Sequence, residues 1–288
     1  MQKKTIRDAD FAGKRVLMRV DFNVPLNDEK EIADDTRIQA ALPSIRYILE
    51  HGAEGLVLMS HLGRPKGKKD PELSLAPVAS YLQSLVDVDV LMAPDVVGDE
   101  VSDMVSDLSD GRILVLENTR FYLEEEGKKC TKEEQEVFAA KLASYGDVYV
   151  NDAFGTAHRA HASTALVCSH MDTCVAGFLM EKEIEYLNNA VQNPKHPFVA
   201  IIGGAKVSGK LEVLHSLIQK VDTLLIGGGM AYTFLKSQGY DVAKSLVEED
   251  LIDTARETLS EAESAGVKLL LPVDNVAADA FSADANPR

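Results

Sequence analysis

The chain has 288 residues, of which 45% are hydrophobic and 26% are charged, and at this length a single core usually divides into two domains. The formal net charge of −16 would repel nucleic acid and anionic lipid, so neither is expected as a partner. No apolar run is long enough to predict a membrane span, and the first residues lack the apolar core of a secretory signal. The three cysteines form no CxxC pair, which favours reduced thiols and a cytoplasmic location.

Short apolar runs alternate with stretches of helical period along the whole chain. The runs predict strands at residues 16–20, 55–59, 113–116, 148–150, 199–202, 224–226 and 269–273. The stretches between them predict helices at residues 36–51, 75–85, 131–144, 180–191, 211–221 and 248–265. This alternation predicts an α/β protein of βαβ units, with two doubly wound, Rossmann-like domains whose parallel sheets are covered on both faces.

A turn bracketed by prolines, Asn193-Pro194-Lys195-His196-Pro197, immediately precedes the strand predicted at 199–202. The residues before it favour a helix that joins the two domains. The predicted organisation is therefore a first domain over residues 1–170, a hinge helix over residues 171–195 and a second domain over residues 196–288.

Arginine is concentrated in the first domain, where nine of the eleven arginines precede residue 171. In open parallel sheets, ligands bind beyond the carboxyl ends of the strands. Four successive predicted strands are followed there by arginine or histidine, and the residues concerned are Arg37, His61, Arg64, Arg120, His158, Arg159 and His161, with Arg19 inside the first strand. Arginine grips tetrahedral and planar oxyanions with paired hydrogen bonds, so this pattern predicts an anion pocket.

Other interpretations of the same residues remain open. Asp21 and Asn23 are also typical of a turn ahead of Pro25. His158 and His161 have a spacing that zinc ligands can show, but no third ligand of matching spacing and no HExxH motif accompanies them.

The second domain is glycine-rich in two loops that follow predicted strands, which hold six of its eight glycines. The strand at 199–202 leads into Gly203-Gly204-Ala205-Lys206-Val207-Ser208-Gly209-Lys210 and then a helix, which is the arrangement that presents backbone N–H groups to phosphate. The spacing approaches a P-loop, but Leu211 stands where that motif needs a hydroxyl for magnesium. The next strand ends in Gly227-Gly228-Gly229, and no GxGxxG motif of a dinucleotide-binding dehydrogenase is present.

Taken together, these motifs resemble the phosphoglycerate kinase family. Arg19-Val20-Asp21-Phe22-Asn23-Val24-Pro25 is similar to the family signature. The other matching segments, in the same order as in the family, are residues 60–65, 117–121, 151–163, 203–210 and 227–229. The resemblance extends over essentially the whole chain and implies a monomeric glycolytic enzyme.

The resemblance implies reversible phosphoryl transfer between 1,3-bisphosphoglycerate and Mg-ADP, giving 3-phosphoglycerate and Mg-ATP. By this resemblance the phosphoglycerate is bound by Arg19, Asp21, Phe22, Asn23, Arg37, His61, Leu62, Gly63, Arg64, Arg120, His158 and Arg159. The nucleotide is bound by Gly204, Ala205, Lys206, Lys210, Gly227, Gly228 and Gly229. Arg37, Lys206 and Lys210 are the implied catalytic residues, and hinge bending that excludes water is the implied motion.

Family members are expected to continue past residue 288 with a ribose-binding Glu and a Gly-Gly-Asp-Ser/Thr loop whose Asp ligates magnesium. Neither motif occurs here, so no metal ligand is assigned, the magnesium ligand is expected beyond residue 288, and the second sheet is expected to be incomplete with apolar surface open to water. The alternative hypothesis is a truncated, catalytically incomplete phosphoglycerate-binding fragment or paralogue. A third hypothesis is an unrelated NTPase or sugar-phosphate binder.

Overall fold

The computed structural model describes residues 3–192, 194–280, 282 and 284–286, and the chain divides into two compact units, residues 1–185 and 186–288. The division falls within residues 171–195, in the helix α6 (Phe178–Gln192). Asn193, which opens the proline-bracketed turn of the sequence, lies outside the described residues. No helix in the described part of the chain is long and apolar enough to cross a membrane.

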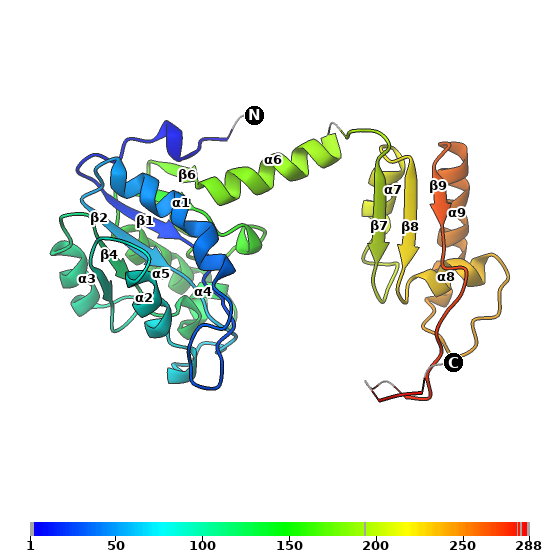
Figure 1. Cartoon of the computed structure of the whole chain (residues 1–288), viewed down its shortest axis with the longest axis horizontal. Helices are drawn as coiled ribbons and strands as arrows, with labels where there is room; N and C mark the ends of the chain where they lie inside the picture. The colour runs from blue at the N-terminus through cyan, green and yellow to red at the C-terminus, as the bar shows by residue number, and fades with distance from the viewer. Residues whose placement is uncertain (1–2, 193, 281, 283, 287–288) are drawn as a thin grey trace. The chain divides into compact units, whose positions relative to one another are not determined.

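Parallel strands rich in Val, Leu and Ile build the first unit. Its strands are β1 (Arg15–Arg19), β2 (Gly55–Met59), β3 (Val90–Met92), β4 (Arg112–Val115), β5 (Val148–Asn151) and β6 (Cys174–Ala176). They form one sheet in the order β3-β4-β2-β1-β5-β6, of which Figure 1 labels β1, β2, β4 and β6. The edge strands β3 and β6 are not among the strands predicted from the sequence, and with three residues each they are too short to show a clear period.

Helices cover both faces of this sheet. The helices of the first unit are α1 (Thr36–Glu50), α2 (Ala76–Gln83), α3 (Asp99–Ser106), α4 (Leu123–Glu126), α5 (Lys132–Ala143) and the start of α6. Short 3-10 turns are η1 (Ile6–Asp8), η2 (Pro71–Leu73), η3 (Thr119–Phe121), η4 (Phe154–Thr156) and η5 (Leu166–His170). Alternate strand residues separate into two cores: Val16 and Met18 pack with α1 and α2, whereas Leu17 packs with α3 and α5.

The second unit has a smaller parallel sheet. Its strands are β7 (Val199–Gly203), β8 (Thr223–Gly227) and β9 (Lys268–Leu270), in the order β7-β8-β9. Its helices are α7 (Leu211–Ile218), α8 (Ala231–Ser237) and α9 (Ile252–Ser264), with the 3-10 turn η6 (Glu249–Leu251) before α9. Leu214, Phe234 and Ala255, one from each helix, pack in one core against Leu224 and Ile226 of β8.

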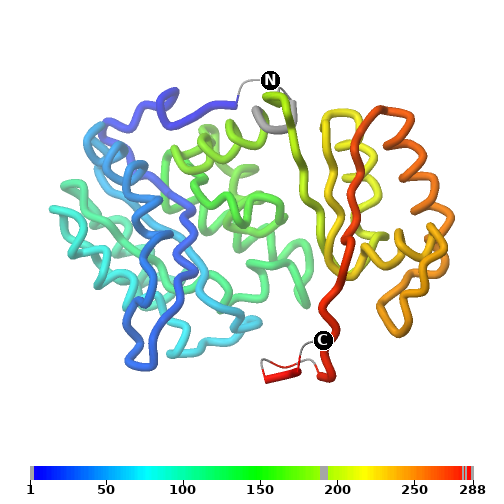
Figure 2. The backbone as a smooth tube through the Cα atoms, turned by 45° about the vertical axis from the view of Figure 1, so that its right-hand side comes forward, coloured from blue at the N-terminus to red at the C-terminus, as the bar shows by residue number. Residues whose placement is uncertain are grey.

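All three helices of the second unit lie on the same face of its sheet (Figure 2). On the opposite face Val199 is 50% exposed and Ile201 is 75% exposed, so within the described residues this face is open. Helices thus cover both faces of the first sheet and one face of the second, the sheet that is expected to be incomplete. The expectation of open apolar surface on the second sheet is confirmed. Alternation along β7 gives the physical reason, because Ala200 and Ile202 turn toward the helices while their neighbours turn away.

Candidate functional site

Four adjacent strands of the first sheet deliver polar loops to one edge. In the order β4-β2-β1-β5 these strands are neighbours, so the residues that follow their carboxyl ends meet there. Hydrogen bonds connect the loops directly. Asn23 Oδ1 accepts the N–H of Gly63 at 2.8 Å, and Arg120 Nη1 donates to the carbonyl of Gly63 at 2.9 Å. The loops after β1, β2 and β4 thus form a single connected surface.

Arg19, at the end of β1, has no exposed surface and uses its guanidinium inside the protein. Its Nε donates to Ser163 Oγ at 2.8 Å, and its Nη2 donates to His61 Nδ1 at 3.2 Å. Glu125 Oε1 lies 3.9 Å from the same Nη2. The structure therefore places Arg19 beneath the site, as a support for residues that approach the surface.

His61 is held neutral by its surroundings. Burial, together with the positive charges of Arg19 and Arg120, lowers the pKa of His61 from 6.5 to about 2. Because a guanidinium can only donate hydrogen bonds, Nδ1 of His61 must accept the one from Arg19, and the ring proton is then on Nε2. His61 is accordingly a neutral donor.

A cavity of about 710 Å³ opens at this edge of the first sheet. Its positively charged lining residues are Arg64, Lys66, Arg120, Lys128, Lys129 and Arg159. The acidic lining residue is Glu126, which forms ion pairs with Arg120 at 3.3 Å and Lys128 at 3.2 Å. An excess of cations in a shallow, partly desolvated cavity is suited to an anion with several charges.

Arg120 shows how the cations of this cavity affect one another. Its side chain is largely buried, and burial lowers its pKa, with Arg159 and Arg19 acting in the same direction and Glu126 and Glu125 opposing them. A bound anion would relieve this repulsion. The cavity therefore has an electrostatic reason to bind phosphate or carboxylate.

The remaining residues predicted for the phosphoglycerate are outside the lining of this cavity. Arg37, at the start of α1, is half exposed and forms an ion pair with Asp21. Of the other predicted residues, Phe22 and Leu62 are buried and pack in the core, while His158 is exposed. The structure thus brings three of the predicted arginines, Arg64, Arg120 and Arg159, into one cavity, and leaves Arg37 on neighbouring surface.

Several residues of this region are not found by reading the sequence. Lys66, Lys128 and Lys129 occur in lysine-rich runs that are typical of solvated surface, yet they line the cavity. Glu125, on α4, is fully buried and accepts hydrogen bonds from Ser163 Oγ at 2.6 Å and Thr119 Oγ1 at 3.2 Å. Its position among Glu124, Glu125 and Glu126 gives no signal, because only the fold shows which of three consecutive glutamates turns inward.

In the second unit, the glycine loop between β7 and α7 carries two exposed lysines, Lys206 and Lys210. Within the described residues neither lysine forms an ion pair, although the charge of Lys206 acts on Glu248, and both side chains are exposed. The arrangement of strand, glycine loop and helix predicted from the sequence is present, with α7 beginning at Leu211.

The triple glycine after β8 packs against this loop. The N–H of Met230 donates to the carbonyl of Gly204 at 2.8 Å. Gly228 has φ of +69°, and a Cβ placed there would lie 3.0 Å from the backbone N and O of Gly204. Only glycine combines this conformation with so close an approach. The two predicted nucleotide loops therefore lie side by side at the carboxyl end of the second sheet.

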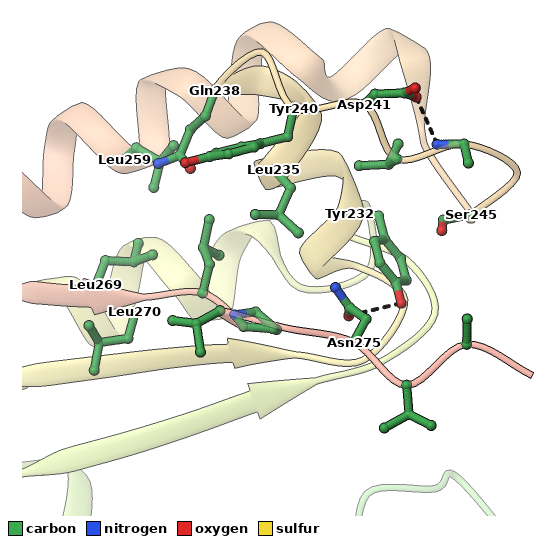
Figure 3. A pocket seen from close by; sticks show the side chains of 17 residues that line it. Tyr232, Leu235, Gln238, Tyr240, Asp241, Ser245, Leu259, Leu269, Leu270 and Asn275 are labelled. Carbon is green, nitrogen blue, oxygen red and sulfur yellow. Dashed lines mark hydrogen bonds between the residues drawn. The ribbon is translucent and has the colours of Figure 1, made fainter. Parts of the chain in front are cut away.

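A second cavity of about 710 Å³ lies elsewhere in this unit, between α8, β9 and the segment that follows β9 (Figure 3). Tyr232 and Asn275 face each other there, with Tyr232 Oη donating to Asn275 Oδ1 at 3.2 Å. Its lining includes Leu235 and Leu269 but neither Lys206 nor Lys210. Among the described residues no Lys or Arg lines this cavity, so its lining offers a phosphate no cationic partner. Across the described residues, no group of three or more His, Cys, Asp or Glu side chains could hold a metal ion.

Comparison with known proteins gives a consistent result. The family model described as phosphoglycerate kinase matches residues 6–288. A phosphoglycerate kinase of Prosthecochloris aestuarii is 58% identical over 285 residues, which are 99% of this chain and 70% of the relative. A phosphoglycerate kinase of Chlorobaculum tepidum is 55% identical over 288 residues, which are 100% of this chain and 71% of the relative.

Solved structures agree with the sequence relatives. The structure of phosphoglycerate kinase from Coxiella burnetii has a TM-score of 0.81 at 39% identity, and the match covers 100% of this chain and 70% of that one. The structure of phosphoglycerate kinase from Pyrococcus horikoshii OT3 has a TM-score of 0.74 at 32% identity, with 95% of this chain and 68% of that one covered.

Proposed function

This chain belongs to the phosphoglycerate kinase family, and on that premise we propose that its first unit holds phosphoglycerate and its second unit holds the nucleotide. The chain is a phosphotransferase with a carboxyl group as acceptor. Its reaction is reversible phosphoryl transfer between 1,3-bisphosphoglycerate and ADP, giving 3-phosphoglycerate and ATP. The alternative is a catalytically incomplete phosphoglycerate-binding fragment or paralogue. It is not favoured, because phosphoglycerate kinases are 54–58% identical to this chain.

The cation-lined cavity of the first unit is the observation that supports the phosphoglycerate site. In a chain of net charge −16, it gathers three arginines and three lysines around one acidic residue. Phosphoglycerate carries a phosphate and a carboxylate, both of which arginine binds through paired hydrogen bonds. Arg64, Arg120 and Arg159 are therefore assigned to the substrate's anionic groups.

Buried residues support this site from below. Neutral His61, with its proton on Nε2, offers a hydrogen bond to an oxygen of the substrate. Arg19 fixes the orientation of that ring from Nδ1 and is assigned to positioning. Asp21 and Asn23 order the loop after β1, through the ion pair of Asp21 with Arg37 and the hydrogen bond from Gly63 to Asn23.

Catalysis is assigned to Arg37, Lys206 and Lys210. Phosphoryl transfer requires positioning of the reactants and neutralisation of charge on the transferred group, and it needs no covalent nucleophile from the protein. Two exposed ammonium groups on a glycine loop can neutralise nucleotide phosphates, and a guanidinium can neutralise the transferred group. We assign residues 171–195 as the hinge whose bending brings the two substrates together and excludes water.

Magnesium is assigned as a part of the nucleotide substrate, bound to its phosphates. Within the described residues no group of three or more acidic, His or Cys side chains could hold it. A monomer, which the family resemblance implies, and a location in the cytoplasm, which the free cysteines favour, complete the proposal.

Replacing Arg37 tests the catalytic assignment. Arg37→Ala is expected to lower turnover by about 10²–10³, the usual effect of removing one donor to developing charge. The measurement is a coupled phosphoryl-transfer assay, with melting temperature recorded to verify folding. Arg46→Ala is the matched control, because Arg46 is an exposed arginine on the same helix. Its guanidinium donates a hydrogen bond to the carbonyl of Leu85. Turnover of Arg37→Ala close to that of the control would remove Arg37 from the catalytic residues.

A further inference from the structure

Glu248, which precedes the turn η6, lies against the glycine loop that carries Lys206 and Lys210. Its Oε2 accepts the N–H of Val207 at 2.5 Å and the N–H of Ser208 at 3.1 Å. Its Oε1 accepts Ser208 Oγ at 2.7 Å. Three donors from two consecutive residues therefore converge on a single carboxylate, and charge-assisted hydrogen bonds of this kind are the stronger ones in proteins.

The backbone of Glu248 is itself fixed to the neighbouring helix. Its N–H donates to Thr233 Oγ1 at 3.2 Å, and Thr233 on α8 is 1% exposed. Its carbonyl accepts the N–H of Leu251, the last residue of η6, at 3.0 Å. Since α8 directly follows the triple glycine of β8, Glu248 connects the two loops assigned to the nucleotide.

The charge of Glu248 is maintained by the loop that it holds. Its pKa is lowered chiefly by the hydrogen bond from the Ser208 hydroxyl, and also by the two N–H groups and the charge of Lys206, while burial opposes the shift. Val207, whose N–H donates to Glu248, is fully buried, whereas Lys206 and Lys210 are exposed. Glu248 thus holds the loop through a buried residue, Val207, and an exposed one, Ser208, while the side chains of Lys206 and Lys210 remain exposed.

We propose that Glu248 is a positioning residue for nucleotide binding, which holds the loop of residues 203–210 in the conformation that presents Lys206 and Lys210 to the nucleotide phosphates. This inference rests on the proposed function of the loop. Three of the loop's eight positions are glycine, so without the carboxylate the loop samples many other conformations. Affinity falls in proportion to the fraction of molecules whose loop has the competent conformation.

Titration of the 288-residue chain with ADP, by calorimetry, tests the proposal. Glu248→Gln is expected to weaken ADP binding about tenfold, corresponding to a loop that is competent about one tenth of the time. Glu249→Gln is the matched control, because it makes the same change in charge one residue away, where the carboxylate pairs with Lys236 on α8. The control should bind ADP within about twofold of the wild-type chain, and Glu248→Gln should keep its affinity for 3-phosphoglycerate.

Three outcomes would overturn the role of Glu248. Unchanged ADP affinity in Glu248→Gln would show that the loop needs no anchor, and tighter ADP binding would make the carboxylate a competitor of the nucleotide. An equal loss of ADP and 3-phosphoglycerate binding would indicate a general loss of structure. Ser208→Ala is a milder variant, which removes only the hydroxyl donor and should weaken ADP binding about two- to threefold.

Amide hydrogen exchange provides a measurement that is independent of the ligand. In Glu248→Gln, exchange at Val207 and Ser208 should accelerate, while exchange at Leu224 in the core of β8 should not change; unaltered exchange at the two loop amides overturns the proposal.

Lys206→Ala distinguishes a failure of the proposed function of the loop from a failure of the role of Glu248. If Lys206→Ala leaves ADP affinity unchanged, or the wild-type chain does not bind ADP, the proposed function of the loop fails and this inference fails with it. If Lys206→Ala weakens binding and Glu248→Gln does not, only the role of Glu248 fails.

Discussion

Glu125→Gln would neutralise a carboxylate that has no exposed surface and lies 3.9 Å from the guanidinium of Arg19. Glutamine retains the size of the side chain and one oxygen for Ser163 and Thr119. The buried charge of Arg19 would then have only neutral partners among the described residues, which include the Ser163 hydroxyl and the His61 ring. The change therefore isolates the electrostatic contribution of this carboxylate to the support beneath the cavity.

The magnitude follows from the pKa of Glu125. Burial alone would raise that pKa, but nearby His161, the charge of Arg19 and the hydroxyl of Ser163 together lower it from 4.5 to about 2. Each pKa unit corresponds to about 1.4 kcal/mol, so the ionised carboxylate stabilises the folded state by about 3 kcal/mol. Breaking a buried ion pair by removing one partner costs about 3–5 kcal/mol, which agrees. Against a total stability of about 5–15 kcal/mol, this is a large loss.

The sign of the pH dependence follows from the same shift. Because the folded-state pKa of Glu125 lies below its unfolded value, its stabilisation is fully present above about pH 4.5 and is lost as the pH falls toward 2. Wild type and Glu125→Gln should therefore differ by about 3 kcal/mol in unfolding free energy at neutral pH, and the difference should shrink below pH 4.5. Urea denaturation followed by far-ultraviolet circular dichroism at a series of pH values measures this.

Two further variants complete the experiment. Glu124→Gln, in the same turn but not in the network, should change the unfolding free energy by less than about 0.5 kcal/mol. Combining Arg19→Met with Glu125→Gln removes both charges and should cost less than the sum of the single changes. A difference between wild type and Glu125→Gln that is under 1 kcal/mol, or one that stays constant between neutral and acidic pH, would refute this reasoning.

Three other predictions concern binding and packing. Arg64→Ala should weaken 3-phosphoglycerate binding about tenfold and leave ADP binding unchanged, by calorimetry, and an equal loss for both ligands would contradict its place in the phosphoglycerate site. Gly228→Ala should destabilise the second unit by about 1–3 kcal/mol, because its φ is positive and Gly204 leaves little room for a Cβ; an unchanged melting temperature would count against that contact. Ile201→Ser should be nearly neutral in thermal unfolding while Ile202→Ser should cost about 2–4 kcal/mol, and similar losses for both would mean that the open face of the second sheet is covered.

The sequence predicts the strands that have strong apolar runs and misses those that do not. The run at 55–59 coincides with β2, whereas β3 and β6 have three residues each and are found only in the structure. The apolar run at 269–273 predicts a strand over all five residues, but β9 ends at Leu270. An apolar run shows that residues can be buried in a sheet, and it does not show where hydrogen bonding to a neighbouring strand ends.

Of the residues at the candidate site, some are predicted from the sequence and others are not. Arg64, Arg120 and Arg159 are predicted together because each follows a parallel strand, and the rule that such ends meet at one edge is general. Glu125 and Glu248 could not be predicted, since their contacts join positions 38 and 40 residues away, and nothing local distinguishes them from neighbouring glutamates. Sequence patterns identify side chains that face a ligand more readily than those that hold other side chains in place.

The pKa of His61 lies far below the pH range in which histidine usually changes charge. Histidine ordinarily changes charge between about pH 5 and 8, but this ring has a pKa of about 2 and keeps one tautomer throughout that range. A phosphate monoester, by contrast, gains its second charge near pH 6. At the proposed phosphoglycerate site, this imidazole therefore adds no pH dependence to binding across that range. The second ionisation of the ligand's phosphate, which does fall in that range, remains a source of pH dependence at the proposed site.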